Sequence, residues 1–282
     1  MHKSFHLLAI LCALLLGACS LTRVAYNYAT PVLTWYVDDF VDLSDSQRDW
    51  IRVRIDRAFE WHRRSELPEY QRFLRSVMLR AAAPLTEDDA RAIYEGLRGH
   101  YRRALEFVLP DIADLLLTLE AEQIDRLERK FAESNDKIVN ASVKGTPEDR
   151  RRRRANQYID HFEVWAGRLS GEQRSVITTR VHAMRGFTEE WLGDRRFRQS
   201  EFLALLRAKP DRARMLAGLR RLLLDMDTWR RPEYIAMLHE RDRRIFEMAA
   251  AVSLTLTPEQ RTHLQKKLGG YLQDVVYLMA AV

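Results

Sequence analysis

Cysteine is almost absent from this chain, which has two, Cys12 and Cys19, in 282 residues. Both lie in the first nineteen residues, so the rest of the chain can form no disulfide and offers no thiol nucleophile and no cysteine ligand for zinc or an iron–sulfur cluster. Glycine and proline are also scarce, with 11 and 8 residues, which excludes collagen-like and low-complexity chains. No apolar run reaches the roughly 20 residues of a membrane-spanning helix.

The residues that are present favour helices. Apolar residues make up 46% and charged residues 30% of the chain, enough apolar surface for a core. Apolar residues recur with a period near 3.6, as in the stripe Tyr158, Ile159, Phe162, Trp165 and Leu169, and no stretch alternates as a strand would. The sequence therefore predicts an all-α fold, either an antiparallel helical bundle or stacked helical hairpins.

Prolines mark the expected helix boundaries. The pairs Thr30-Pro31, Thr146-Pro147 and Thr257-Pro258 each place a capping residue before a proline, as at the first turn of many helices. The other five prolines, including Pro68 and Pro110, are expected between helices because proline lacks an N–H donor.

The N-terminus carries the most specific signal. A positive charge at Lys3 precedes an apolar run from Leu7 to Leu16, and Leu16-Gly17-Ala18-Cys19 follows. This arrangement resembles the bacterial lipobox. The resemblance implies that residues 1–18 are a lipoprotein signal peptide and that Cys19 becomes the acylated first residue, the covalent lipid being the only cofactor expected. The alternative is an ordinary signal peptide followed by a chance cysteine.

Location and domain organisation follow from the lipobox. Ser20 stands where an aspartate would resemble an inner-membrane retention signal, so we expect an outer-membrane, periplasm-facing lipoprotein. Residues 19–29 are expected to be the lipid anchor and a short tether, and residues 30–282 one all-helical periplasmic domain. Formal net charge is +6, but export argues against nucleic acid as a partner. The expected partners are the membrane, through the lipid, and an envelope protein or client.

A short pattern, Leu-Ser/Thr-x-x-Gln, recurs along the chain. It starts at Leu43, Leu169 and Leu256, and altered versions start at Leu85 and Leu119. A capping box explains it, because a Ser or Thr at the N-cap accepts a bond from the third helical residue and a Gln there bonds back. The predicted cap pairs are Ser44 with Gln47, Ser170 with Gln173, and Thr257 with Gln260.

Two family resemblances follow. Leu256, Thr257 and Gln260 resemble the signature of the Spy-like periplasmic chaperones, all-helical proteins that hold unfolded clients, although the sites at 43 and 169 have serine. The whole chain also resembles an uncharacterised family of proteobacterial lipoproteins, known only as a domain of unknown function. That resemblance implies no activity and transfers no functional residue except Cys19. It is carried by the lipobox and by Tyr28, Pro31, Trp35, Asp38, Asp39, Leu43 and Gln47.

Two clusters could support chemistry. Five carboxylates, at Asp38, Asp39, Asp42, Asp45 and Asp49, suggest a cation site, but pairing with Arg48 and Arg52 explains them better, and no metal site is predicted. His239 and Asp242 lie on one helical stripe and could form an acid–base pair. We favour a buried polar pair satisfied by an arginine from a neighbouring helix, and we predict no catalytic residue.

The densest charge run is Arg150–Arg154, which we expect to be a solvated helix start, with contact to lipid phosphate or an acidic partner as the alternative. The sequence as a whole predicts a non-catalytic binding, scaffold or adaptor lipoprotein of the cell envelope. The alternatives are a Spy-like client-holding chaperone and, less favoured, a cell-envelope hydrolase.

Overall fold

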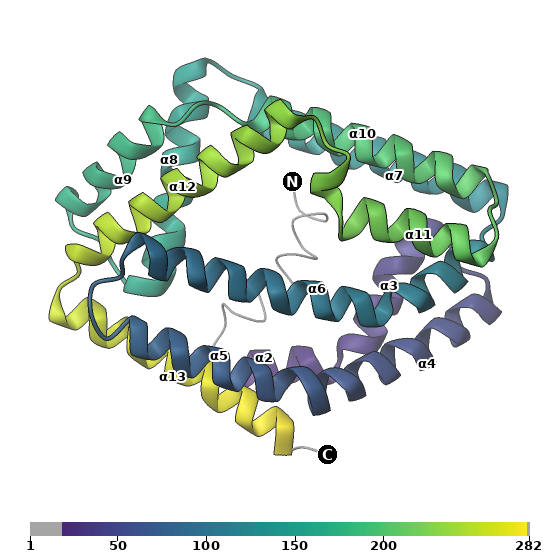
Figure 1. Ribbon diagram of the computed structural model, residues 1–282, viewed down its shortest axis with the longest axis horizontal. Helices are drawn as coiled ribbons and strands as arrows, with labels where there is room; N and C mark the ends of the chain where they lie inside the picture. The colour runs from purple at the N-terminus through teal and green to yellow at the C-terminus, as the bar shows by residue number, and fades with distance from the viewer. Residues whose placement is uncertain (1–18, 281–282) are drawn as a thin grey trace. The chain divides into compact units, whose positions relative to one another are not determined.

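The computed structural model describes residues 19–280, and over this part of the chain every regular element is a helix (Figure 1). The all-α prediction is confirmed, because the 3.6-residue period of apolar side chains gives each segment one face to bury. None of the described helices is long and apolar enough to cross a membrane.

The chain divides into two compact units, each assembled from separate stretches of sequence. The first unit contains the residues up to Glu66, Tyr101–Ala141 and Glu189–Arg230, and the second contains Leu67–His100, Ser142–Thr188 and the residues from Arg231 onward. We expected one domain over residues 30–282. Chains of about this length commonly divide their buried apolar residues among more than one core, and the two units contain separate clusters of such residues.

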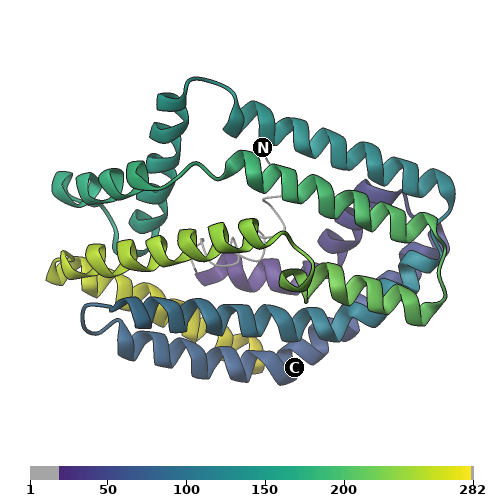
Figure 2. The same ribbon diagram turned by 45° about the horizontal axis from the view of Figure 1, so that its top comes forward.

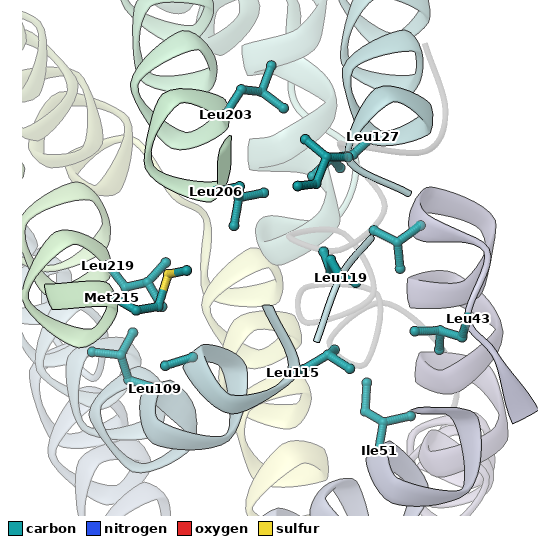
Figure 3. Packing of buried hydrophobic residues seen from close by; sticks show 13 residues of the cluster. Leu43, Ile51, Leu109, Leu115, Leu119, Leu127, Leu203, Leu206, Met215 and Leu219 are labelled. Atoms are coloured by element: carbon teal, nitrogen blue, oxygen red, sulfur yellow. The ribbon is translucent and has the colours of Figure 1, made fainter. Parts of the chain in front are cut away.

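The first unit has a core made mainly of leucine. Leu43 and Leu119 of the recurrent pattern lie in it, together with Ile51 and Leu127, which follow them by eight positions (Figure 3). Its helices are α2 (Cys19–Asn27), α3 (Ala29–Val41), α4 (Asp45–Trp61), the π-helical turn η1 (His62–Glu66), the second part of α6 (Glu87–Leu117), α7 (Ala121–Ile138), α10 (Thr188–Arg207), α11 (Arg212–Leu223) and the 3-10 turn η3 (Met226–Thr228).

The second unit consists of helices that pack in pairs around clusters of buried apolar side chains. Helix α13 lies beside α5 and also contacts α8, while α9 contacts both α8 and α12 (Figure 2). The core includes Leu169, Ile177 and Val252. Its helices are α5 (Leu67–Arg80), the first part of α6, α8 (Pro147–Ala166), α9 (Gly171–Ala183), α12 (Pro232–Leu254) and α13 (Pro258–Ala280), and the π-helical turn η2 (Val139–Val143) falls at the boundary between the units.

Proline placement was predicted correctly at some helix starts and wrongly at other positions. Pro147 and Pro258 begin α8 and α13, and Pro31 lies in the first turn of α3, where the N–H has no intrahelical partner. Pro110, by contrast, lies inside α6. Pro68 is the second residue of α5, which follows the π-helical turn without a break. A proline inside a helix costs about 3 kcal/mol because a backbone bond is lost. At Pro110 the buried neighbours Leu109 and Ala113 offset that cost by packing.

Candidate functional site

The residues expected to form a tether are helical. Leu16, Gly17 and Ala18 lie outside the described residues, and Cys19 is the first residue of α2. Tyr26 is buried, with its ring edge-on to Phe59 at 5.0 Å between ring centroids and its hydroxyl hydrogen-bonded to Nδ1 of His62 at 3.0 Å. Since these contacts join α2 to the end of α4, no flexible linker separates Cys19 from the first unit.

The opposite face of α2 and α3 is apolar and exposed. Val24, Tyr28, Val32 and Trp35 have exposed fractions of 51, 64, 41 and 57%. Val24 lies on α2, Tyr28 lies between the two helices, and Val32 and Trp35 lie on α3; we call these four residues the outer seam. Single exposed apolar residues are ordinary, but four along two consecutive helices indicate a contact surface.

The acidic cluster after the outer seam is neutralised by bases. Each of the five aspartates has a basic nitrogen within 4 Å, and Oδ1 of Asp38 also accepts the backbone N–H of Leu43. The hydrogen bond that Arg48 donates to Asp38 raises the pKa of Arg48. Among the residues that the structure describes, no group of three His, Cys, Asp or Glu is placed to hold a metal ion. The pairs are Asp38–Arg48 at 3.1 Å, Asp39–Lys130 at 2.9 Å, Asp42–Arg126 at 3.8 Å, Asp45–Arg48 at 2.7 Å and Asp49–Arg52 at 3.3 Å.

The recurrent pattern forms capping boxes. The side chains of Ser44, Ser170 and Thr257 accept the backbone N–H of the glutamine three residues later. Each glutamine side-chain oxygen in turn accepts the N–H of its cap residue. These bonds satisfy donors that a helix start leaves without intrahelical partners.

The glutamines do more than cap, because they pair between hairpins. In the second unit, Nε2 of Gln173 donates to Oε1 of Gln260 at 2.8 Å, and Nε2 of Gln260 donates to Oε1 of Gln173 at 3.0 Å. Their second N–H groups donate to the carbonyls of Thr255 and Arg168, both at 2.8 Å. Every donor and acceptor of the two amides is therefore used.

The first unit repeats the same arrangement. Gln47 and Gln123 form a reciprocal amide pair, at 3.3 and 2.8 Å. Gln47 also donates to the carbonyl of Thr118, and Gln123 donates to the carbonyl of Asp42. In all four cases the accepting carbonyl belongs to the residue just before the partner's leucine. In each unit, one amide pair thus joins the starts of two helices.

Sequence reasoning missed this pairing because it treated each glutamine as a local cap. The sequence signal that could have revealed the pairing was the side-chain amide of glutamine, which can both donate and accept. Gln occurs at 47, 123, 173 and 260, whereas the fifth site has Asp89, which has no N–H to donate. Glu120, which stands at the cap position of the altered site at 119, still lets Gln123 pair.

The fifth site is a capping box with a carboxylate. Oδ2 of Asp89 accepts the backbone N–H of Thr86 at 3.0 Å and its hydroxyl at 2.7 Å, and Arg80 donates to Oδ1 at 2.5 Å. These bonds, that of the Thr86 N–H above all, lower the pKa of Asp89 to about 2. The start of α6 is thereby supported by an ionised side chain.

We expect the carboxyl carbon of Asp89 to titrate at about pH 2 in an NMR titration. Because its pKa is lowered on folding, Asp89 stabilises the fold above its ordinary pKa, and this contribution is lost as pH falls towards 2. Arg80→Gln should raise the midpoint only in part, since the Thr86 N–H bond remains. A wild-type midpoint near 4 would contradict the capping geometry.

His239 and Asp242 do not form a buried pair. His239 is exposed, whereas Asp242 is largely buried and accepts two bonds from Arg241, at 2.9 and 2.6 Å. The arginine comes from the same helix and not from a neighbour. Burial raises the pKa of Tyr94, and the charge of Asp242 raises it further. The three-residue offset allowed both side chains to face inward, but α12 is turned so that only Asp242 does.

The arginine run at the start of α8 is not wholly solvated. Arg154 is half-buried and donates to the carbonyls of Val181 and Met184 at 3.1 Å, and this burial lowers its pKa. The last carbonyls of a helix lack intrahelical partners and attract cations. Arg154 therefore closes the end of α9, while Arg150 donates to the carbonyl of Val143 at 2.9 Å before its own helix.

A buried charged group in the first unit was not identified from the sequence. Asp194 on α10 is 7% exposed. Both of its oxygens accept from Arg230 at 3.0 Å, and Nε of Arg198, one turn later, donates to Oδ2 at 2.9 Å. Arg198 could have been paired with Asp194 from the i,i+4 spacing. Arg230 could not, because 36 residues separate it from Asp194.

Comparison with known proteins gives one finding. A family model described as "Family of unknown function (DUF6279)" matches residues 39–234, more than half of the chain. No curated protein and no solved structure matches the chain. The matched range begins after the outer seam and includes Asp194, Gln47, Gln123 and Gln173.

Proposed function

We propose that this chain, which belongs to the DUF6279 family of unknown function, is a lipid-anchored, non-catalytic scaffold or adaptor of the outer membrane that faces the periplasm. The family match bears out the resemblance to a domain of unknown function and adds no activity. The proposal therefore depends on the residues of this chain.

The observation that carries the proposal is the direct continuation of Cys19 into a packed helix. The lipobox places the acylated residue at position 19, and α2 begins there. Tyr26, seven residues later, is held by Phe59 and His62. A lipid on Cys19 would hold a helical body close to the membrane at a defined point, which suits a protein that positions a partner there.

Neither alternative function has an observation that favours it. The client-holding hypothesis rested on Leu256, Thr257 and Gln260, and the last two are engaged in a cap and in the amide pair. The hydrolase hypothesis rested on His239 and Asp242, which the structure separates into an exposed and a largely buried residue. We therefore propose the scaffold role alone.

Acylation of Cys19 is testable by mass spectrometry. We expect the mature N-terminal peptide of the native protein to begin at Cys19 and to carry covalent acyl chains. Ser20→Asp serves as the matched control, because it keeps Cys19 and should move the acylated protein from the outer to the inner membrane on a density gradient. A mature N-terminus at another residue, without lipid, would refute the anchor.

The scaffold role is tested by chemical crosslinking in intact cells. We expect the wild-type protein to give a discrete heteromeric product with an envelope protein, and Ser20→Asp to lose it while remaining acylated and folded. If the product is absent from wild-type cells, or if it persists when the protein is held in the other membrane, the proposed role at the outer membrane is wrong.

A further inference from the structure

We propose that the outer seam, formed by Val24, Tyr28, Val32 and Trp35, lies in the headgroup region of the membrane that anchors Cys19. Helices α2 and α3 would then lie along the membrane surface as a second attachment. This inference rests on the proposed acylation of Cys19, and it adds a lipid-binding surface of the protein itself.

The position of the seam follows from helix geometry. A helix rises about 1.5 Å per residue, so Val24 lies about 8 Å and Tyr28 about 14 Å along the axis from Cys19. Acyl chains on Cys19 are in the hydrocarbon layer, which places the first turn of α2 at the membrane–water boundary. The seam is thus continuous with the attachment point of the lipid.

The other face of these helices is already occupied. Tyr26 and Ala29 are buried, and Thr34 is buried with its hydroxyl bonded to the carbonyl of Thr30 at 2.8 Å. The hydroxyl of Thr30 bonds to Asp56 of α4 at 2.6 Å. These contacts hold one side of α2 and α3 against the rest of the first unit, and the outer seam lies on the other, exposed side.

The chemistry of the seam suits a lipid headgroup region. Tyrosine and tryptophan prefer this zone because their rings are apolar and carry one polar group. From Cys19 to Val37 the chain has no acidic residue, and its one charged residue is Arg23, which anionic headgroups would attract. The first acids, Asp38 and Asp39, come only after the seam ends.

A second protein molecule is a weaker occupant than lipid. A stable protein–protein interface takes about 20–30 residues on each side, whereas the seam has four. A lipid surface needs no such area, because the covalent acyl chains already keep the helix at the membrane.

The test uses the absence of other thiols. After removal of Cys12 and acylation of Cys19, the mature chain has no free cysteine, so one introduced cysteine can be spin-labelled specifically. We would compare Val32→Cys on the seam with Leu117→Cys, whose native side chains are 41 and 37% exposed. Leu117 is the last residue of α6 and precedes Thr118, whose carbonyl accepts from Gln47 of α4, so the control site lies outside α2 and α3.

The full acylated protein would be placed in vesicles of phosphatidylethanolamine and phosphatidylglycerol. We expect the label at 32 to collide several-fold less often with a water-soluble nickel complex, and more often with oxygen, than the label at 117. Val24→Cys should behave like Val32→Cys. Thermal unfolding of each labelled protein checks that the fold is retained.

Three other outcomes would contradict the lipid-binding seam, and one of them would also contradict the anchor. If the protein floats with vesicles but the labels at 32 and 117 meet nickel equally, the seam does not bind lipid and the anchor still stands. If the native protein is not acylated and does not float, the proposed function fails and this inference fails with it. Dipolar broadening of the label at 32 would show that a second copy of the chain covers the seam instead of lipid.

Discussion

Asp194→Ala is expected to lower the free energy of unfolding by about 3–5 kcal/mol, because it removes the buried carboxylate that pairs with Arg230 and leaves the more exposed Asp227 at 3.9 Å. The side chain of Arg230 is only 10% exposed, and both of its bonds to Asp194 would be lost. Water cannot easily replace the carboxylate at so enclosed a position. Arg198, which is more exposed, should contribute less to the loss.

Urea unfolding followed by far-UV circular dichroism measures this effect. The transition midpoint should fall while its slope stays constant, and if the two units unfold separately the loss should fall on the first unit's transition. Asp125→Ala is the matched control. Asp125 is 58% exposed and shares Arg207 with Glu128, so its loss should cost less than about 1 kcal/mol. Equal effects of the two substitutions would show that the Asp194 cluster is not buried.

Gln260→Ala is expected to cost about 2–4 kcal/mol, well above the value of about 1 kcal/mol for an ordinary cap. Gln173 and Gln260 are 3 and 9% exposed. Removing one amide leaves the other half-bonded and the carbonyl of Arg168 without its donor. Each unsatisfied buried group costs about 1–3 kcal/mol.

A double-mutant cycle distinguishes pairing from capping. If the amides act as a pair, Gln173→Ala combined with Gln260→Ala should cost less than the sum of the single changes by about 0.5–3 kcal/mol. Gln123→Ala in the first unit is the control, because its amide pair is less buried and water can replace the lost bonds. Strict additivity at 173 and 260 would reduce the motif to two independent caps.

The same substitutions bear on the chaperone resemblance. Thr257→Ala should cost about 1 kcal/mol and Thr257→Gly only a few tenths, as expected for a helix cap. If the wild-type protein suppresses aggregation of an unfolded model protein, and Thr257→Gly abolishes this without lowering the melting temperature, the motif has a client-binding role after all.

Local sequence was sufficient for the helix starts. The bonds of a capping box join residues three positions apart, so Ser170 and Gln173 could be recognised without knowledge of the fold. The apolar period likewise predicted which side chains are buried, as at Ile159 and Leu169. The spacing that placed His239 beside Asp242 was ambiguous, because a period of 3.6 does not say which of two polar residues at its edge turns inward.

The sequence by itself determined the helical class and the capped starts of α4, α8, α9 and α13, because each depends on residues within a few turns of one another. Only the tertiary structure decided which turns meet and which charges are buried. Gln173 and Gln260 are 87 residues apart, and Asp194 and Arg230 are 36 apart. No periodicity reports such contacts, since their partners are chosen by the packing of whole helices. The outer seam depends on both: its apolar residues are visible in the sequence, but only the burial of Tyr26, Ala29 and Thr34 shows which side of these helices stays exposed.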